Sequence, residues 1–333
     1  MSFDNAAIHV GLNAVVIAAE DAVAKVLAVH HEGAYALPSG LFDPKGDRTL
    51  NLGLRRWIKD LTGLDVGYVE QLYTFGNQYR DTRELEQQAR FLSIGYLGLM
   101  RERQIAKGAR AEWHDIYDFL PWEDFRGGRP AVLNDCIFPA LDDWCNTATD
   151  REVRDQRQLR VATVFGRPDG ALDLEKPLQR FELMYEAGLL PESHRDYALI
   201  REKSEGIFSF NNMNIKSLFD VSNKLGGQPM AMDHRRILAS ALERVRGKIK
   251  YRPLVFELMP EVFTLLQLQQ VVEALSGIVL HKQNFRRLVQ AEMLVEETGQ
   301  VDASSRGRPA ALFRFRPQVL SERPAPGVGL PKK

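Results

Sequence analysis

A basic segment near the C-terminus carries the clearest chemical signal in this sequence of 333 residues. Residues 281–316 hold four acids against seven basic side chains, Lys282, Arg286, Arg287, Arg306, Arg308, Arg314 and Arg316. Helical spacing turns Phe285, Leu288 and Val289 toward a core. The exposed side would then carry Lys282, Gln283, Asn284, Arg286 and Arg287. Arg, Asn and Gln match guanine and adenine edges in the major groove, although an ordinary solvated helix can have the same composition.

The residues after this helix predict a wing. Residues 294–296 and 312–315 alternate between apolar and polar side chains, and a polar connection rich in Gly, Ser and Arg joins them. Arg306 and Arg308 in this connection would contact phosphates or the adjacent minor groove. A basic helix followed by such a hairpin favours DNA binding over a merely solvated surface.

A capping pattern precedes the basic helix. Thr264 and Gln267 have the spacing of a capping box that opens a helix over residues 265–275, and Gly277 is placed to end it. The backbone N–H groups at such an N-terminus suit a DNA phosphate, so Thr264 and Gln267 are candidate contacts. Helix, short turn, helix and β-hairpin is the order of a winged helix-turn-helix, which we expect over residues 251–316.

A second group of candidate residues lies in the N-terminal half. Tyr73 and Phe75 fall on an apolar stretch, and Arg80 and Arg83 follow within about ten residues. Aromatic rings can stack on a base such as adenine, and guanidinium groups can pair with phosphate or be oriented by Asp81. The same residues fit core aromatics on a strand followed by a solvated loop, so their types alone leave both interpretations open.

These side chains require a scaffold of strands around one strong helix. Residues 10–18 and 23–30 are apolar runs rich in β-branched residues, and further strands are expected at 69–75 and 90–99. Helical spacing before Gly63 is shown by Leu50, Leu54, Trp57, Ile58 and Leu61. Strands that flank helices with short connections predict a mixed α/β sandwich for residues 1–145.

The remaining segments have weaker patterns. We expect a helical insertion or linker over residues 146–230, with helices at 178–190 and 215–225, but its sequence indicates no function. Asp233 is a suitable N-cap for a helix over residues 234–248. This linker helix, within residues 231–250, is our candidate for joining the two halves and for dimerisation. The proline-rich tail, residues 317–333, is expected to be disordered.

Composition restricts the class of protein. The chain has 44 basic and 44 acidic side chains, so its formal net charge is zero and the basic segment is a local feature. Cys136 and Cys145 are too few for a disulfide framework or a zinc site. No export signal is visible, and no apolar run approaches ~18 residues. We therefore expect a soluble, cytoplasmic protein with reduced thiols and no membrane partner.

Residues 36–42, Ala-Leu-Pro-Ser-Gly-Leu-Phe, and a helix ending in Leu-Thr-Gly-Leu at residues 61–64 resemble the Nudix box. In that family a strand, a loop and a helix carry clustered glutamates, which bind the divalent metal ions that polarise a diphosphate and activate water. The resemblance implies a Nudix-like α/β/α sandwich, with a C-terminal winged helix-turn-helix added to it.

The acidic positions of that box are mostly lost. With Gly63 aligned, Arg56 stands at the family's arginine. The four glutamate positions are occupied by Arg48, Trp57, Asp60 and Leu61. A lone, shorter carboxylate cannot hold the metal cluster that diphosphate cleavage needs. We therefore expect no catalytic residues, no bound metal and no enzymatic activity by this route, and we expect Arg56 and Asp60 to form an ion pair.

A second resemblance is to Nudix-related transcriptional regulators of NAD metabolism. In the N-terminal half it rests on residues 71–76 (Gln-Leu-Tyr-Thr-Phe-Gly), 79–83 (Tyr-Arg-Asp-Thr-Arg) and 92–97 (Leu-Ser-Ile-Gly-Tyr-Leu). It implies a domain that binds ADP-ribose or a related nucleotide, in the class of NAD or ATP, as effector. The expected contacts are Tyr73, Phe75, Arg80, Arg83 and Arg56. The run from Glu84 to Gln88 departs from the family's tighter loop, so the resemblance does not fix which nucleotide binds.

The C-terminal half carries the same resemblance more specifically. Segments at residues 232–234, 251–254, 258–260, 284–287 and 307–310 all look like that family and stand in its order. Together the two matches cover about residues 10–125 and 230–316. They imply a nucleotide effector that controls binding of a homodimer to a palindromic double-stranded DNA operator.

The leading hypothesis is therefore a regulator, expected to be a repressor, of NAD-biosynthesis or NAD-salvage genes. One alternative is an active Nudix hydrolase that uses acids outside the box, such as Glu84 or Glu86. Another is a nucleotide-sensing adaptor whose winged helix binds protein. The hypothesis includes no catalytic cofactor.

Overall fold

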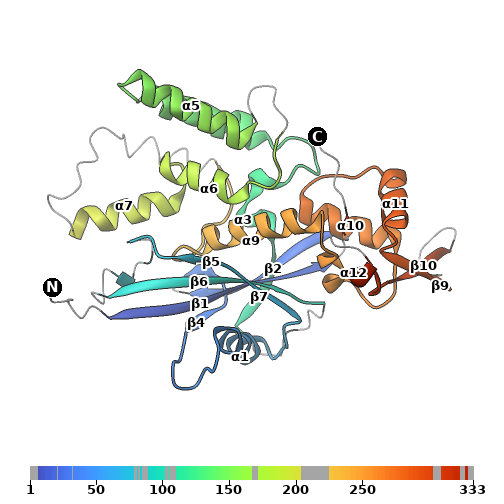
Figure 1. Cartoon of the computed structure of the whole chain (residues 1–333). Helices are drawn as coiled ribbons and strands as arrows, with labels where there is room; N and C mark the ends of the chain where they lie inside the picture. Colours follow the sequence, from blue (N-terminus) through green and yellow to red (C-terminus); the bar gives the residue numbers. More distant parts are fainter. Residues whose placement is uncertain are drawn as a thin grey trace.

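The structure is a computed structural model that describes residues 7–20, 22–31, 33–78, 81, 83–84, 89–101, 105, 110–166, 172–203, 225–302, 309–322 and 327–328 (Figure 1). Within these ranges seven strands form a mixed sheet of order β3-β2-β1-β6-β5, in which β4 also pairs with β1 and β7 with β2. Their bounds are β1 Ile8–Glu20, β2 Val23–His31, β3 Ala34–Ala36, β4 Ser39–Leu41, β5 Tyr68–Phe75, β6 Arg90–Leu99 and β7 Ala111–Asp115. The central pair, β1 and β6, is parallel, and the other pairs are antiparallel. The four predicted strands are confirmed.

Helix α1 (Leu50–Thr62) begins and ends where the sequence predicts. The Thr49 hydroxyl accepts a hydrogen bond from the N–H of Leu52 at 3.2 Å, as an N-cap does. Gly63 has a φ of 75°, a left-handed conformation that costs glycine little and that ends the helix. Leu54 and Ile58 are buried against the sheet and hold the helix on it.

Helices cover both faces of the sheet (Figure 1). Side chains of β1 alternate between them, since successive residues of a strand point to opposite faces. Ala14 and Val16 share a core with α1, whereas Val15 and Ile17 share a core with α9 (His234–Ile249). This arrangement confirms the expected α/β/α sandwich.

The linker helix α9 starts differently from the prediction. Asp233 is the N-cap residue, but its side chain makes no capping hydrogen bond. Its carboxylate instead accepts from Arg236 at 2.9 Å, because it pairs with a guanidinium on the next turn. The apolar face of the helix, with Ile237, Leu238 and Leu242, is buried as predicted.

The described part of the insertion expected over residues 146–230 consists mainly of helices. A π-helical turn (Leu133–Ile137) and α4 (Phe138–Asn146) follow α3 (Ile116–Phe119) and lead into the insertion, which contains α5 (Arg151–Phe165), α6 (Pro177–Glu186) and α7 (Pro191–Lys203). The helix expected to reach residue 190 ends at Glu186, because Gly188 adopts a φ of 70° before the next helix starts. The helix expected at residues 215–225 lies outside the described residues except for Leu225.

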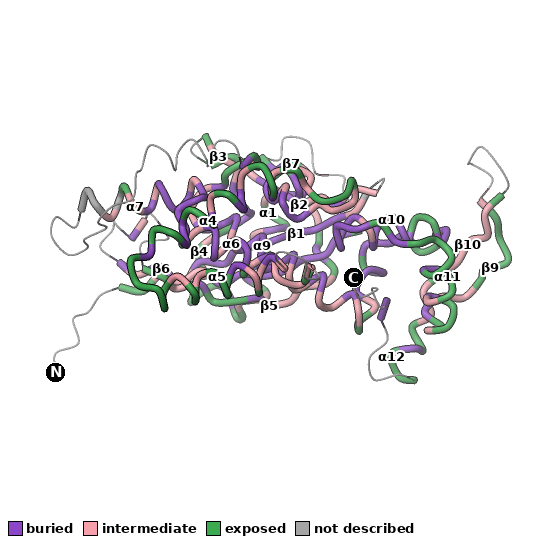
Figure 2. Tube along the Cα trace, turned by 90° about the horizontal axis from the view of Figure 1, so that it is seen from above, coloured by how far each residue is buried: buried purple, intermediate pink, exposed green. Residues whose placement is uncertain are grey.

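The C-terminal elements have the winged-helix order. They are a 3-10 turn (Leu254–Leu258), β8 (Phe263–Thr264), α10 (Leu265–Ser276), α11 (Lys282–Ala291), β9 (Val295–Asp302) and β10 (Ala310–Phe315), and the sheet order is β8-β10-β9. Strand β9 is longer than predicted. Pairing with β10 continues past a bulge to Asp302, so the residues expected to form the start of a loop belong to a strand. Figure 2 shows α11 and this hairpin at one end of the molecule, with mostly exposed and half-buried residues.

The tail after residue 316 differs from the predicted disorder where it is described. Helix α12 spans Val319–Glu322. Val328 is fully buried, and its N–H donates to the carbonyl of Ile249 at 2.8 Å. The last carbonyls of a helix lack partners within the helix, and this contact at the end of α9 satisfies one of them.

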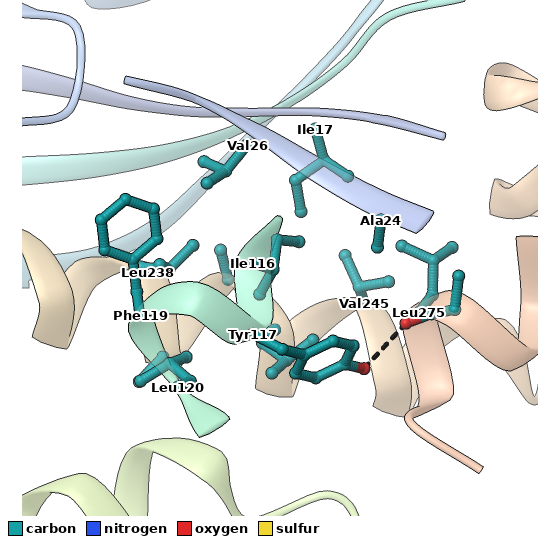
Figure 3. Close-up of a cluster of buried hydrophobic side chains, with 14 of the residues drawn as sticks. Ile17, Ala24, Val26, Ile116, Tyr117, Phe119, Leu120, Leu238, Val245 and Leu275 are labelled. Carbon is teal, nitrogen blue, oxygen red and sulfur yellow. Dashed lines mark hydrogen bonds between the residues drawn. The ribbon is translucent and has the colours of Figure 1, made fainter. Parts of the chain in front are cut away.

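The two halves of the chain share a core. Figure 3 shows Ile17 of β1, Val26 of β2, Val245 of α9 and Leu275 of α10 in one cluster. The Tyr117 hydroxyl donates to the carbonyl of Ala274 in α10 at 2.7 Å. The winged helix is therefore packed on the sheet rather than tethered to it. None of the described helices is long and apolar enough to cross a bilayer, and Cys136 and Cys145 form no disulfide.

Candidate functional site

Arg56 of α1, the residue at the Nudix arginine position, has a different partner from the one predicted. Its guanidinium donates to both carboxylate oxygens of Asp47, at 3.0 and 2.9 Å. The hydrogen bond from Arg56 is the main reason that the pKa of Asp47 lies below its usual value. The expected ion pair with Asp60 is therefore wrong. Asp47 precedes the helix and also accepts from the N–H of Asp43, so the arginine fastens the loop to α1.

Trp57 occupies the position of a metal-binding glutamate and packs on the neighbouring strand. Its ring lies so close to Gly40 that a Cβ added there would come within 2.0 Å of it. Its indole N–H donates to the carbonyl of Leu41 at 3.2 Å. Apolar bulk thus fills the space between α1 and β4. In the described part of the chain, no three His, Cys, Asp or Glu side chains gather where they could hold one metal ion.

Glu84, one of the two acids that the hydrolase alternative requires, stabilises the fold through hydrogen bonds within the domain. It is buried, and its carboxylate accepts from the N–H of Phe91 at 2.9 Å and from Arg90 at 3.3 Å. Glu86, the other acid, lies outside the described residues. Of these two acids, the described one is therefore not available to bind a metal ion.

Tyr73 and Phe75 line a hollow of about 440 Å3 between β5 and the insertion. Its other walls come from α5, α6 and α9, with Arg160, Gln179, Glu182 and Arg236 among the lining residues. Tyr73 is 54% exposed, whereas Phe75 is buried and has the Arg236 guanidinium 4.9 Å from its ring centroid. The two aromatics therefore share one site, on the face of the sheet opposite α1.

Two arginines predicted to join these aromatics are elsewhere. Arg56 lies on α1, and Arg83 is not among the residues that line the hollow. Arg83 donates to both oxygens of Asp81, at 2.9 and 2.6 Å, and lies 4.5 Å from the ring centroid of Phe91. Of the two roles predicted for Arg83, phosphate binding and pairing with Asp81, the structure shows the pairing with Asp81. Arg80 lies outside the described residues.

A buried histidine marks the start of α9. The N–H of Leu37 donates to Nδ1 of His234 at 2.9 Å, so this nitrogen carries no proton. Burial, together with the smaller effect of the nearby positive charge of Arg83, lowers the pKa of His234 to about 3. The imidazole is therefore neutral near pH 7 and joins the linker helix to the loop before β4.

A fully buried cluster of two arginines and one glutamate lies where the sheet, the insertion and α9 meet. Glu123 accepts from Arg180 at 2.6 and 2.8 Å and from Arg246 at 2.6 Å, and all three side chains are at most 1% exposed. Burial alone would raise the pKa of Glu123, but the two arginines outweigh it and hold the pKa below its usual value. The cluster has a formal net positive charge, and Arg180 donates further hydrogen bonds to the backbone carbonyls of Val164 and Asp173.

The same cluster reaches the winged helix. Arg246 donates to the carbonyl of Leu275 in α10 at 3.3 Å and to the backbone carbonyl of Glu123 at 2.8 Å. Gly277, which ends α10 with a φ of 71°, has no room for a Cβ, since it would lie 2.6 Å from Arg246. The N–H of Phe125 donates to the Gly277 carbonyl at 2.7 Å. These contacts join α6 and α9 to α10 through Arg180, Glu123 and Arg246.

Helix α11 presents its polar residues as the sequence predicts. Phe285 and Val289 are buried and Leu288 is half-buried. The exposed residues include Lys282, Gln283, Asn284, Arg286 and Arg287. In the described ranges no acid pairs with the three cations of this set. Their charges are available to a polyanion, which is what a DNA-recognition helix requires.

The cations on the wing are arranged differently. Arg314 pairs with Glu296 across the hairpin at 2.5 Å, and Arg316 pairs with Glu322 of α12 at 2.5 Å. These two arginines therefore add less to the local positive charge than their number suggests. Arg306 and Arg308 lie outside the described residues.

The capping box at α10 is present, and it changes the role expected for Thr264. Its hydroxyl accepts from the N–H of Gln267, and Gln267 Oε1 accepts from the N–H of Thr264. Thr264 is also buried, so its side chain cannot contact a phosphate. The prediction for that side chain is wrong, because the helix cap uses it. Gln267 is exposed, and its side-chain oxygen is the atom used in the cap.

Sequence reasoning missed the charged residues of the insertion and of α9. A signal for Arg246 existed, since it continues the spacing of the buried residues Leu238 and Leu242 along α9. No local pattern indicates Arg160 or Gln179, because they meet Tyr73 only through tertiary packing.

Comparison with known proteins agrees with this architecture. Residues 255–315 match the family model of the NrtR DNA-binding winged helix domain. Over 86 residues the chain is 41% identical to the ADPR responsive transcriptional repressor NtrR of Acinetobacter baylyi, a match that covers 26% of this chain and 34% of that protein. The chain thus spans about a third of the length of that curated relative.

Two solved structures have the same overall fold. Shewanella oneidensis NrtR complexed with a 27mer DNA has a TM-score of 0.54 at 22% identity, over 94% of this chain and 95% of that one. A MutT/nudix family protein from Enterococcus faecalis has a TM-score of 0.51 at 16% identity, over 92% and 88% of the two chains. At these identities the likeness shows the fold, which is a Nudix-like sandwich with a C-terminal winged helix.

Proposed function

We propose that this NrtR-like chain is a transcriptional repressor whose DNA binding responds to a nucleotide. The observation that carries the proposal is the exposed helix α11, whose Lys282, Arg286 and Arg287 have no acidic partner in the described ranges. The winged helix is packed on a sandwich whose helix α1 carries Trp57, Asp60 and Leu61 at positions where the Nudix box has glutamates. The match of residues 255–315 to a DNA-binding winged helix family supports the same conclusion.

The recognition helix would lie in the major groove. Gln283, Asn284 and Arg286 have the hydrogen-bonding groups that read adenine and guanine edges, whereas Lys282 and Arg287 suit phosphates. Gln267 at the start of α10 and the wing residues Arg306 and Arg308 would add backbone contacts. The protein would act in the cytoplasm as a homodimer on a palindromic operator, because a two-fold pair of recognition helices matches such a site.

The nucleotide would act as an effector rather than a substrate. Arg56 is held by Asp47, and Trp57 fills the space beside β4, so α1 offers no cluster of acids for metal-assisted hydrolysis. The relative from Acinetobacter baylyi is described as responsive to ADPR, which favours ADP-ribose over NAD or ATP. The regulated genes would be those of NAD biosynthesis or salvage.

Effector binding changes DNA affinity only if the two conformations of the protein bind the nucleotide with different affinities. The buried contacts of α9 provide a route for this difference. Arg246 on that helix donates hydrogen bonds to the Glu123 carboxylate and to the backbone carbonyl of Leu275 in α10 of the winged helix. A nucleotide that shifts α9 would thereby shift α10 and the recognition helix beside it.

Gel-shift titration on the upstream regions of NAD-metabolism genes tests the proposal, with and without ADP-ribose, NAD and ATP. We expect specific binding that one of these nucleotides alters. Arg286→Ala should weaken specific binding by about 1–3 kcal/mol if this side chain reads a base. Arg151→Ala, which removes the same charge from the distant helix α5, is the matched control and should bind normally. Absence of specific binding at every nucleotide concentration would refute the proposal.

A further inference from the structure

We infer that the hollow between β5 and the helical insertion binds the effector, with the base against Tyr73 and the phosphates at Arg160. This inference rests on the proposed function and adds to it the position of the site and the share of the insertion in it. The hollow, of about 440 Å3, has the size of a small-molecule pocket, which is about 300–1,000 Å3.

Tyr73 provides the surface on which a base would stack. Large aromatic side chains are usually covered, but this one is 54% exposed at the edge of the sheet. The ring of Phe75 lies next to it, with 6.2 Å between the centroids of the Tyr73 and Phe75 rings. Val164, Leu178 and Leu183 supply apolar surface on the other side. A flat ring can therefore lie between an aromatic wall and an aliphatic wall.

Two side chains of the hollow have polar groups without partners. The Thr74 hydroxyl and the Gln179 amide make no side-chain hydrogen bond within the part of the chain that the structure describes. An amide donates and accepts at once, as the edge of a purine requires. These groups can give a base a preferred orientation at the cost of displacing only water.

Arg160 of α5 is suited to hold a phosphate. Its guanidinium pairs with Glu186 of α6 at 2.9 and 2.5 Å, but both side chains are about half exposed. An exposed pair of this kind contributes little, typically about 0–1 kcal/mol, so the arginine can exchange its partner easily. A diphosphate offers it two charge-assisted, bidentate hydrogen bonds instead.

Arg236 of α9 lines the hollow and is held in place by several hydrogen bonds. It donates to Asp233 at 2.9 Å and to Asn77 at 3.3 Å, and it also pairs with Glu182 of α6. Strand β5, the insertion and the linker helix therefore meet at one side chain. A ligand that draws α5 toward Tyr73 would act on α6, and through it on α9. In this arrangement the insertion supplies part of the effector-binding site.

Isothermal titration calorimetry of the full chain tests this assignment, with ADP-ribose and adenosine as probes. Tyr73→Ala should weaken both ligands about tenfold, the usual effect of losing one stacking partner for a base. Arg160→Ala should weaken ADP-ribose about tenfold and leave adenosine unchanged. Arg151→Ala, on the same helix with its side chain 92% exposed, is the matched control and should leave both affinities unchanged.

The results separate this inference from the proposed function. Normal ADP-ribose affinity in Tyr73→Ala or Arg160→Ala overturns the assignment, as does a wild-type chain that binds no ADP-ribose. Loss of ADP-ribose binding in Arg56→Ala, with the hollow variants unaffected, would place the ligand on the opposite face of the sheet and also overturn it. If the hollow binds ADP-ribose but the chain binds no operator DNA, the inference stands and the proposed repressor fails.

Discussion

Replacing Glu123 by Gln should strongly destabilise the protein, because it removes the countercharge of two buried arginines. Both carboxylate oxygens of Glu123 are engaged, at 2.6–2.8 Å from Arg180 and 2.6 Å from Arg246. The Gln side chain has nearly the same shape, but it is neutral and its NH2 group would face guanidinium donors. The substitution therefore tests charge and hydrogen bonding rather than packing.

The expected loss follows from the burial of the cluster. Breaking a buried ion pair costs about 3–5 kcal/mol, since the remaining charge stays buried without compensation. Two arginines lose their partner here, so we expect the upper part of that range. Domains are stable by about 5–15 kcal/mol, so the change removes a large fraction of the total. For a chain of this size the midpoint of thermal unfolding should fall by about 6–7 °C.

Urea unfolding followed by circular dichroism measures this effect, with Glu186→Gln as the control. That variant breaks a pair with Arg160 whose side chains are 50% and 48% exposed, and it should cost at most about 1 kcal/mol. A third variant that replaces Glu123, Arg180 and Arg246 together by Leu, Met and Met should recover much of the loss, since apolar replacements of buried ion pairs are often neutral. If Glu123→Gln costs no more than the control, the electrostatic account of this cluster is wrong.

Two further predictions concern His234 and Gly40. Burial lowers the pKa of His234 from 6.5 to about 3, so below pH 6.5 the unfolded chain binds a proton that the folded protein does not. The unfolding free energy should therefore fall by about 1.4 kcal/mol per pH unit between pH 6.5 and 3 from this group. His234→Gln, whose amide oxygen can still accept from Leu37, should reduce that slope in urea titrations at pH 7 and 4.5, and parallel profiles would contradict the assignment. Gly40→Ala should cost about 1–3 kcal/mol because its Cβ would lie 2.0 Å from the Trp57 ring, whereas Gly127→Ala meets open space, and equal melting temperatures would refute the packing argument.

The elements that the sequence predicted best are those with local signals. Helix α11 has the predicted bounds, because Phe285 and Val289 mark its buried face within the helix itself. Thr264 and Gln267 cap α10 through a spacing that is readable in four residues. The exposure of the α11 cations followed from the same periodicity, whereas the other predicted DNA contacts, at Thr264 and on the wing, had no such signal.

The features that sequence reasoning missed depend on contacts between distant residues. Glu123 meets Arg180 and Arg246 only after three segments have packed together. Arg56 was matched with Asp60, one helical turn away, but the loop brings Asp47 to it with better geometry. The periodicity of apolar residues predicts which face of a helix or strand a side chain lies on. It does not predict which distant residue forms an ion pair or hydrogen bond with that side chain.

The contact between α10 and the sandwich has a consequence for chimeric proteins. A fragment of residues 251–316, cut out and fused to another protein, would leave Leu275 without Val245 and Ala24, which lie beside it in Figure 3. It would also leave the Ala274 carbonyl without the Tyr117 hydroxyl. The winged helix is thus not expected to fold by itself, and a fusion protein that carries it alone should fold poorly and aggregate. Swaps among homologues would need to carry α3 and α9 along with it.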